Sequence, residues 1–263
     1  MGHDAAGPRN YAAGGLATSR ILPHTGATMS GTANTLTISL LAGIAVASFA
    51  QTPGAPAITS KVLVEASLGD TADPKVSVLS LSISLGVTIP SHSHQGPVFA
   101  YILQGDIENQ VDPDPPKVYH PGDFFFEPAM HVHRLLRNLS TTEPAKILVF
   151  QVGDTGKAKT LLQEPAEVAN RGARIMRVTL PPGASLPGAH KHPGPVFAYI
   201  VNGEIENQVD PEPLKVYRAG DVFYEPPLHA HRILRNLSRT EPAELIIFQI
   251  IEKGQPLATG VEE

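Results

Sequence analysis

The chain has 263 residues, no cysteine, 42% hydrophobic and 17% charged residues, and a formal net charge of −5. This composition is typical of a globular protein large enough for two domains that each bury a core. The absence of cysteine excludes disulfides, thiolate metal sites and cysteine nucleophiles. The negative net charge argues against nucleic-acid binding, so we expect a small molecule as the partner.

The first 50 residues do not resemble part of a domain. The uncharged run LTISLLAGIAVASFA, from Leu36 to Ala50, is too short to span a bilayer and ends in small residues. It predicts a disordered tail with a signal peptide over residues 1–50. The mature chain would begin near Gln51, in the periplasm or outside the cell, with no membrane attachment. The alternative is an apolar disordered tail on a cytoplasmic protein, because no basic residue lies between Met29 and Leu36.

The rest of the chain is a tandem repeat. An offset of 98 residues aligns its two halves, and about two-thirds of the aligned positions from His94 to Val152 are identical. Such an offset is about the size of one small domain. The repeat predicts one domain at 51–157, a second at 158–258 and a C-terminal tail at 259–263.

Each half has the pattern of short β-strands. The run from Leu79 to Leu85 alternates apolar and polar side chains. The run from Val98 to Val111 reads as two strands joined at Gln104 and Gly105, which predicts a hairpin. Proline and glycine turn signals separate further short runs, and no long helical periodicity is present. The sequence therefore predicts an all-β sandwich or barrel in each half.

Histidines recur at matched positions of the two halves. Side chains two residues apart on a strand point to the same face, so each His-x-His pair can present two imidazoles to one divalent ion. A third histidine would come from another strand. The alternative is that the histidines only pack or form hydrogen bonds at a barrel mouth. The predicted metal ligands are His92, His94 and His133 in the first half and His190, His192 and His231 in the second.

The histidines and glycines fall in two motifs. The first is Gly, His-x-His and Gly, and the second is Gly, Pro, His and Asn. The matching residues in the first half are Gly86, His92, His94, Gly105, Gly122, Pro128, His133 and Asn138. With the same pattern in the second half, the chain from about Ser60 to Glu252 resembles a bicupin of the cupin superfamily. The resemblance implies an all-β fold of two tandem double-stranded β-helix (jelly-roll) barrels.

The sequence departs from the cupin motifs at two kinds of position. The usual metal-binding glutamate is replaced by Val98 and Val196, and an inner glycine of the second motif by Met130 and Leu228. Three imidazoles alone would form a neutral shell with open positions. Such a shell favours Fe, Ni, Cu or Zn over the harder Mn, with up to two ions per chain.

Two glutamates lie just before the second-motif prolines. If Glu127 and Glu225 face inward, they could replace the missing carboxylate, hold a ligand histidine or act as catalytic base. If they face outward, they are surface acids that could pair with Arg134 or Arg137. The sequence leaves both orientations open.

Other polar residues near the motifs have a structural and a functional interpretation. His131 and His229 could be further ligands or proton carriers, but a surface loop position is favoured. Arg137 and Arg235 could meet a substrate carboxylate, but a structural salt bridge is favoured.

The resemblance implies a range of activities, because one fold carries many chemistries. A three-histidine site is similar to that of cupin dioxygenases, so we expect a metal-binding bicupin that oxidises a small enolate, diketone or phenolic substrate. The alternatives are a non-catalytic module that binds a small molecule such as a carbohydrate, and a cupin isomerase. A homodimer is left open.

Overall fold

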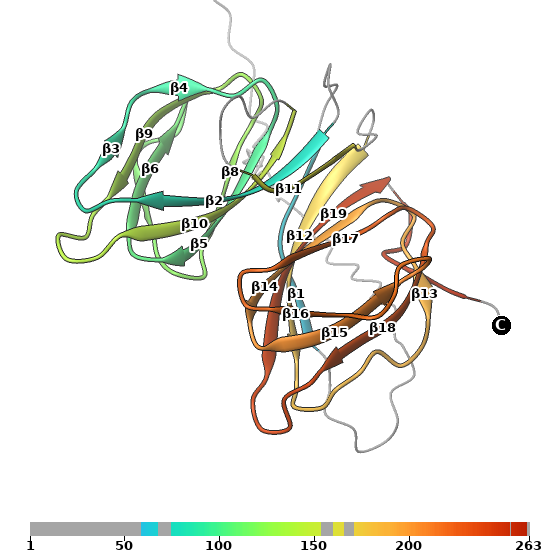
Figure 1. Cartoon of the computed structure of the whole chain (residues 1–263). Coiled ribbons are helices and arrows are strands. Elements are labelled where there is room, and N and C mark those ends of the chain that lie inside the picture. The colour runs from blue at the N-terminus through green and yellow to red at the C-terminus, as the bar shows by residue number, and fades with distance from the viewer. Residues whose placement is uncertain (1–58, 68–74, 154–159, 166–170, 253, 262–263) are drawn as a thin grey trace, which may run out of the picture. The chain divides into compact units, whose positions relative to one another are not determined.

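The computed structural model describes residues 59–67, 75–153, 160–165, 171–252 and 254–261. The predicted signal peptide lies outside these residues. Every regular element within them is a β-strand, so the predicted all-β fold is confirmed (Figure 1). In the ranges given above, no helix is long and apolar enough to cross a membrane.

The first half forms two antiparallel sheets. One has the strand order β11-β2-β10-β5-β8, and the other has the order β3-β9-β6-β7 with β4 also paired to β9. The strands are β2 (Lys75–Ile83), β3 (Thr88–Ile89), β4 (His92–Ser93), β5 (Val98–Gln104), β6 (Ile107–Val111), β7 (Lys117–Tyr119), β8 (Phe124–Glu127), β9 (Val132–Asn138), β10 (Ala145–Val152) and β11 (Thr160–Pro165).

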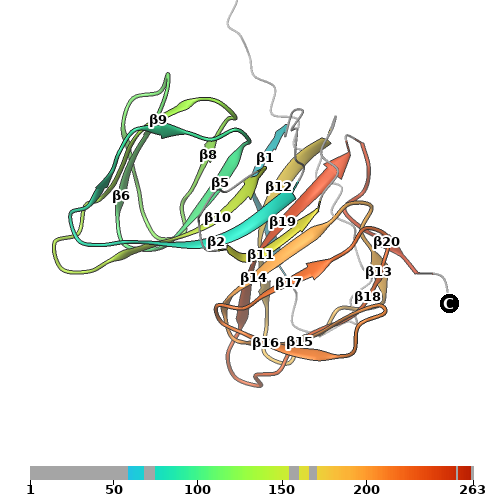
Figure 2. The same ribbon diagram turned by 45° about the horizontal axis from the view of Figure 1, so that its top comes forward.

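The second half repeats this arrangement. Its sheets have the orders β1-β12-β19-β14-β17 and β16-β15-β18-β13-β20 (Figure 2). The strands are β1 (Thr59–Ser67), β12 (Arg171–Leu180), β13 (His190–Lys191), β14 (Val196–Asn202), β15 (Glu204–Val209), β16 (Lys215–Arg218), β17 (Val222–Glu225), β18 (Ala230–Asn236), β19 (Ala243–Glu252) and β20 (Thr259–Gly260).

The core of each barrel lies between its two sheets. In the first half, Ala100 and Ile102 of β5 join one hydrophobic cluster with Ile107 of β6 and Leu136 of β9. Alternate residues of β5 therefore face the barrel interior, as the period of a strand requires. The intervening residues, such as Phe99, are equally buried on the outer face of the same sheet. This double burial explains why β5 has a continuous apolar sequence.

The predicted hairpin at Gln104 and Gly105 is wrong. Strand β5 pairs with β10 and β8, whereas β6 pairs with β7 and β9. The chain turns a corner here and passes from one sheet of the barrel to the other. Gly105 adopts a positive φ of 80°, and a side chain there would meet Ala145 at 3.0 Å. A corner between sheets has the same glycine signal as a hairpin, so the sequence pattern did not separate them.

Two strands pair across the boundary between the repeats. Strand β1 precedes the first barrel but pairs with β12, and β11 follows the first barrel's last long strand but pairs with β2. One hydrophobic cluster also draws on both halves, with the rings of Phe150 and Phe248 stacked at 5.2 Å between centroids. The domain boundary predicted at residues 157–158 stays a prediction. Strand pairing crosses it in both directions.

Candidate metal centres

Short strand pairings bring three histidines together in each barrel. Strand β4 pairs with β9 so that His92 lies opposite His133, and β13 pairs with β18 so that His190 lies opposite His231. The remaining histidine of each His-x-His pair completes the group. The nitrogens of His92, His94 and His133 that could bind a metal lie within 4.8 Å of one another. The structure thus groups the histidines as the motifs predict.

A tight turn before β9 and before β18 holds these groups in place. Met130 and Leu228 adopt positive φ angles of 64° and 63°, where the cupin motif has glycine. The backbone N–H of Met130 donates to the carbonyl of His94 at 2.8 Å, and Leu228 donates to His192 at the same distance. A left-handed conformation costs a non-glycine residue about 1–2 kcal/mol. Both halves thus keep a strained backbone conformation next to the histidines.

Glu127 and Glu225 face inward. Their residues are 5% and 3% exposed, and the Oε2 atom of each lies 3.0 Å from Nδ1 of His133 or His231. Glu127 lies directly across from Val98 in the β5–β8 pairing. The carboxylate therefore projects from the strand next to the position where the cupin motif has its glutamate. Its role as ligand or base stays a prediction.

The carboxylates change the expected charge of the sites. A neutral shell of three imidazoles was predicted from Val98 and Val196, but each barrel holds a buried carboxylate beside its histidines. In the second barrel, the carboxylate of Glu225 belongs to the cluster within 4.8 Å, at 3.4 Å from Nε2 of His192. In the first barrel, Glu127 lies 3.7 Å from Nε2 of His94. The predicted preference against Mn assumed a site without a carboxylate, so it no longer has support.

Hydrogen bonds on the far side of the ring fix the third histidine. Nε2 of His133 lies 2.5 Å from Oδ1 of Asn109 and 3.1 Å from the carbonyl of Leu135. Nε2 of His231 lies 2.6 Å from Oδ1 of Asn207. Both partners are acceptors, so Nε2 carries the proton and donates. In a neutral ring Nδ1 then has a lone pair, and in both histidines this buried atom faces a carboxylate oxygen at 3.0 Å. Two such electron-rich atoms need a cation between them, either a proton or a metal ion.

In each His-x-His pair, a backbone carbonyl also fixes the orientation of one imidazole ring. Nδ1 of His92 donates to the carbonyl of Pro90 at 2.8 Å, and Nδ1 of His192 donates to the carbonyl of Leu257 at 2.7 Å. The Nε2 atoms within each pair lie 3.1 Å apart. Ligands at right angles around an ion with bonds of about 2.1 Å are about 3 Å apart. Two Nε2 atoms this close must have a proton or a metal ion between them, and the spacing fits a divalent ion.

Burial and charge tune these groups toward metal binding. Burial lowers the pKa of His190 to about 4, helped by repulsion from His192 and His231. Burial also lowers the pKa of His94, and Glu127 partly opposes that shift. These rings are neutral at pH 7 and can bind a metal without losing a proton.

The carboxylate of the second site stays ionised. Burial alone would raise the pKa of Glu225, but His231, followed by His192 and His190, brings it below its ordinary value. The lowered pKa means that the neighbouring imidazoles compensate this buried charge in the metal-free fold. A metal ion would take over that compensation from the proton on the imidazole.

Sequence analysis missed the residues that orient the ligands. They are the two asparagines of the repeated stretch ENQVDP and the carbonyl of Leu257. The exact repetition of ENQVDP was an available signal, because surface loops of the two copies differ elsewhere. No sequence pattern marks a backbone carbonyl that follows its partner by 65 residues.

Replacing Asn109 or Asn207 with leucine should weaken metal binding in that barrel by about 10- to 100-fold. The leucine removes the closer of the two hydrogen-bond acceptors of Nε2 and leaves only the backbone carbonyl, so the ring that presents Nδ1 to the ion is held less firmly. Titration of the metal-free variants with Zn²⁺ against a competing chelator measures the change. The same affinity in Asn109→Leu and the unaltered chain would contradict an orienting role.

Other candidate residues lie outside the clusters. His131 and His229 are exposed, and each forms a hydrogen bond to a backbone carbonyl. Arg137 and Arg235 pair with Glu108 and Glu206 on the surface. The favoured structural interpretations therefore agree with their positions.

The first site opens into a cavity of about 380 Å³. Val98 and Ala100 line it, as the strand parity predicts, together with Phe125 and other apolar residues. Its polar lining consists of the three histidines, Glu127, Ser93, Gln95 and Gln151. No lysine or arginine is among the described residues that line it.

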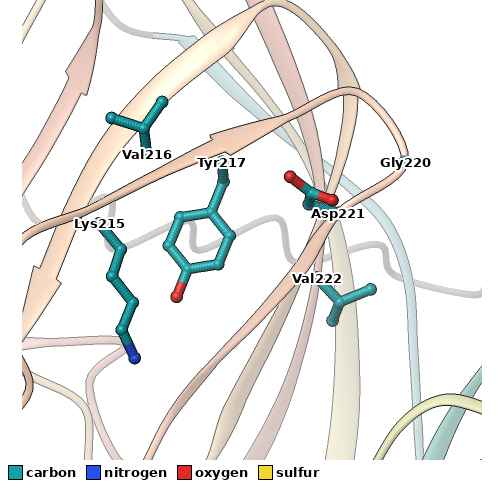
Figure 3. A pocket seen from close by; sticks show the side chains of 6 residues that line it. All are labelled: Lys215, Val216, Tyr217, Gly220, Asp221 and Val222. Atoms are coloured by element: carbon teal, nitrogen blue, oxygen red, sulfur yellow. The ribbon is translucent and has the colours of Figure 1, made fainter.

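A second hollow of about 570 Å³ lies at the turn from β16 to β17 (Figure 3). Lys215, Tyr217 and Asp221 line it, and the ammonium of Lys215 pairs with Glu212 at 2.8 Å. It brings no group of metal ligands together within the described chain. We assign no site to it.

The chain matches the cupin domain family over residues 82–151 and 176–248. No curated protein sequence matches it. The fold is similar to AerE from Microcystis aeruginosa, with 18% identity over 76% of this chain and 96% of that one and a TM-score of 0.55.

Two other solved structures are similar. Oxalate decarboxylase from Bacillus subtilis has 15% identity over 79% of each chain and a TM-score of 0.55. Salicylate 1,2-dioxygenase from Pseudaminobacter salicylatoxidans has 14% identity over 68% of this chain and 72% of that one, with a TM-score of 0.50. The decarboxylase has been described with Mn(II) centres. At this identity the likeness concerns the fold.

Proposed function

The chain belongs to the cupin family, and on that premise we propose that it is a metal-dependent oxidoreductase of the dioxygenase type that acts on a small enolate, diketone or phenolic substrate. One observation carries the proposal: imidazole nitrogens with free lone pairs converge beside a buried carboxylate at an apolar cavity. Such pockets, with few polar groups, are typical of sites that bind small molecules.

Each barrel would hold one divalent ion. In the first, His92, His94 and His133 are the ligands, and Glu127, which faces the same Nδ1 of His133, either joins them or stays free as a base beside the ion. The second has the same three histidines at 190, 192 and 231, with Glu225. A bound ion would supply Lewis acidity and a template for an anionic substrate. Because a carboxylate suits harder metals, Mn joins Fe, Ni, Cu and Zn as a candidate.

The cavity favours a substrate with one anionic end and an apolar body. Its described lining has no lysine or arginine, so a second charged group on the substrate would be unpaired there. Away from the histidines and Glu127, only Ser93, Gln95 and Gln151 offer polar side chains. A carbohydrate would find few partners for its hydroxyl groups, which disfavours the sugar-binding and isomerase alternatives.

Glu127 is the proposed catalytic base of the first site, and Glu225 has the equivalent position in the second. Glu127 is the carboxylate in the described cavity lining. A base must lie within hydrogen-bond reach of the proton it takes, and a substrate hydroxyl bound between His94 and Glu127 meets this condition. Removal of that proton would produce the enolate or phenolate that the site can then hold.

Oxygen uptake tests the proposal. The metal-free protein is loaded separately with Fe, Mn, Ni, Cu or Zn, and each form is mixed with a flavonol, a diketone or a catechol. We expect oxygen consumption with at least one pair and none in the double variant His94→Ala/His192→Ala, which lacks a ligand in both barrels. Tight binding of these ligands by every metal form without oxygen consumption would replace the oxygenase with a binding module.

We also propose that the chain is exported and that Leu36–Ala50 acts as its signal peptide. The support is the length of this uncharged run and its small terminal residues. In the natural host, the mature protein should occur outside the cytoplasm with its amino terminus near Gln51. Amino-terminal sequencing checks this, and an intact chain that retains the residues before Leu36 would contradict it.

A further inference from the structure

The two metal-ligand clusters differ in what lies over them. After β19 the chain turns at Gly254, which has a φ of 86°, and Gln255 donates to the carbonyl of Glu252 at 3.1 Å. Strand β20 then pairs with β13, with Gly260 opposite His190. The backbone N–H of Val261 donates to the carbonyl of Ala189 at 3.2 Å. The C-terminal segment, residues 254–261, is therefore attached to the strand that carries a metal ligand.

The C-terminal segment also contacts the ligands directly. The carbonyl of Leu257 accepts hydrogen bonds from Nδ1 of His192 at 2.7 Å and from Nε2 of Gln249 at 2.8 Å. Gln249 belongs to β19, on the barrel wall. One backbone carbonyl thus connects the C-terminal segment, a metal ligand and the wall.

The first barrel lacks this arrangement within the described chain. There, β4 pairs with β9 alone. The strand that follows the first barrel's last long strand is β11, and it pairs with β2 rather than with β4. The two halves therefore differ at the strand that carries the His-x-His pair: β13 has a second neighbour, β20, and β4 has none among the described residues.

The histidines of the second site are also less exposed to solvent than those of the first. The side chain of His192 is 15% exposed, whereas that of His94 is 26% exposed. His190 is 4% exposed, and its counterpart His92 is only partly buried. The first cluster lines the cavity of about 380 Å³. An incoming molecule thus has a more open approach to the first cluster.

We propose that the two sites have divided their work: the first is the open site for substrate and metal exchange, and the second is closed by the C-terminal segment and holds its ion as a structural centre. The inference rests on the proposed metal binding at both sites. A chelator or substrate must reach a free position on the ion before a ligand leaves. In the second site, this requires β20 to separate from β13 and Leu257 to release His192.

Metal release tests the division. The chain is loaded with Zn²⁺ or Co²⁺ and mixed with excess 4-(2-pyridylazo)resorcinol, and release is followed by absorbance. We expect two phases of one ion each. His94→Ala should remove the fast phase, and His192→Ala should remove the slow phase. In a chain that ends at Glu252, the slow phase should accelerate about tenfold or more, because several hydrogen bonds are lost, while the fast phase keeps its rate.

A matched pair of point variants tests the strand pairing without a truncation. Val261→Pro removes the N–H that donates to Ala189, and Val261→Ala keeps it. We expect Val261→Pro to accelerate the slow phase and Val261→Ala to leave it unchanged. Equal slow rates in the two variants and the unaltered chain would overturn the role of this contact.

A metal-free measurement gives a second readout. Diethyl pyrocarbonate acylates neutral imidazoles that it can reach, and peptide mass spectrometry reports each histidine separately. In the full metal-free chain His94 should react faster than His192, and in the chain that ends at Glu252 the two rates should approach each other. Equal rates in the full chain would overturn closure of the second site.

The outcomes separate this inference from the proposed function. If two ions bind but leave at one rate, or if the slow ion belongs to the first site, the division of work is wrong and the metal-dependent function stands. If no ion binds, the proposed function itself fails.

Discussion

Replacing His94 or His192 with alanine is expected to remove one divalent ion per chain and to leave the other in place. Each residue supplies one of three imidazoles, and its Nε2 lies 3.1 Å from that of the neighbouring ligand. Alanine leaves two imidazoles and a gap that water fills, which lowers the affinity by orders of magnitude. Elemental analysis of the purified variants measures the loss, and the double variant should retain no ion.

His131→Ala and His229→Ala are the matched controls. These histidines lie two residues before the third ligand of each site but are exposed and stand outside the clusters. Each control should retain both ions. If His94→Ala kept two ions, or if His131→Ala lost one, the ligand assignment would be wrong.

Glu127→Gln and Glu225→Gln are expected to weaken metal binding by about 10- to 100-fold in their own barrels. The amide keeps the volume of the carboxylate and loses its charge. The effect on stability should be larger with the metal than without it. Without metal, the imidazoles hold the pKa of Glu225 below its ordinary value, so its charge stabilises the fold at neutral pH and glutamine should lower the melting temperature slightly. With metal, the same change removes a ligand or its support, and the melting temperature should fall further.

Thermal unfolding of the metal-free and metal-loaded forms measures both effects. Glu143→Gln and Glu241→Gln serve as controls, because these two glutamates are exposed and occupy equivalent positions of the repeat. They should change neither quantity. A rise in the melting temperature of metal-free Glu225→Gln would contradict compensation of the charge by the imidazoles, and unchanged metal affinity would exclude the carboxylate from the site.

The sequence was sufficient for the fold and for the grouping of the histidines. The period of two along a strand predicts that His92 and His94 share a face, and this relation needs no knowledge of the neighbouring strand. The motif spacing then added His133. Both inferences use local geometry together with a resemblance that occurs twice in the chain.

The orientation of Glu127 required information that the sequence does not hold. Its side chain meets the cluster because β8 pairs with β5 in the register that places it opposite Val98. A shift by one residue would have reversed its face. The hairpin prediction failed for a related reason, since strands that are adjacent in sequence belong to different sheets here. Asn109 and Leu257 act through contacts between distant segments, which a strand pattern cannot reveal.

The strand pairing across the repeats has a consequence for the modularity of the molecule. The repeated unit is a run of about 98 residues, whereas one sheet of each barrel includes a strand from beyond the predicted boundary. A fragment cut near Lys157 would carry β1 without β12, its partner, and would lose β11 from the edge of its own sheet. Each fragment would expose bare backbone donors and acceptors along a sheet edge, a template for aggregation. The two copies thus exchange edge strands, and we expect either copy to need its exchanged strand before it can serve as a separate module.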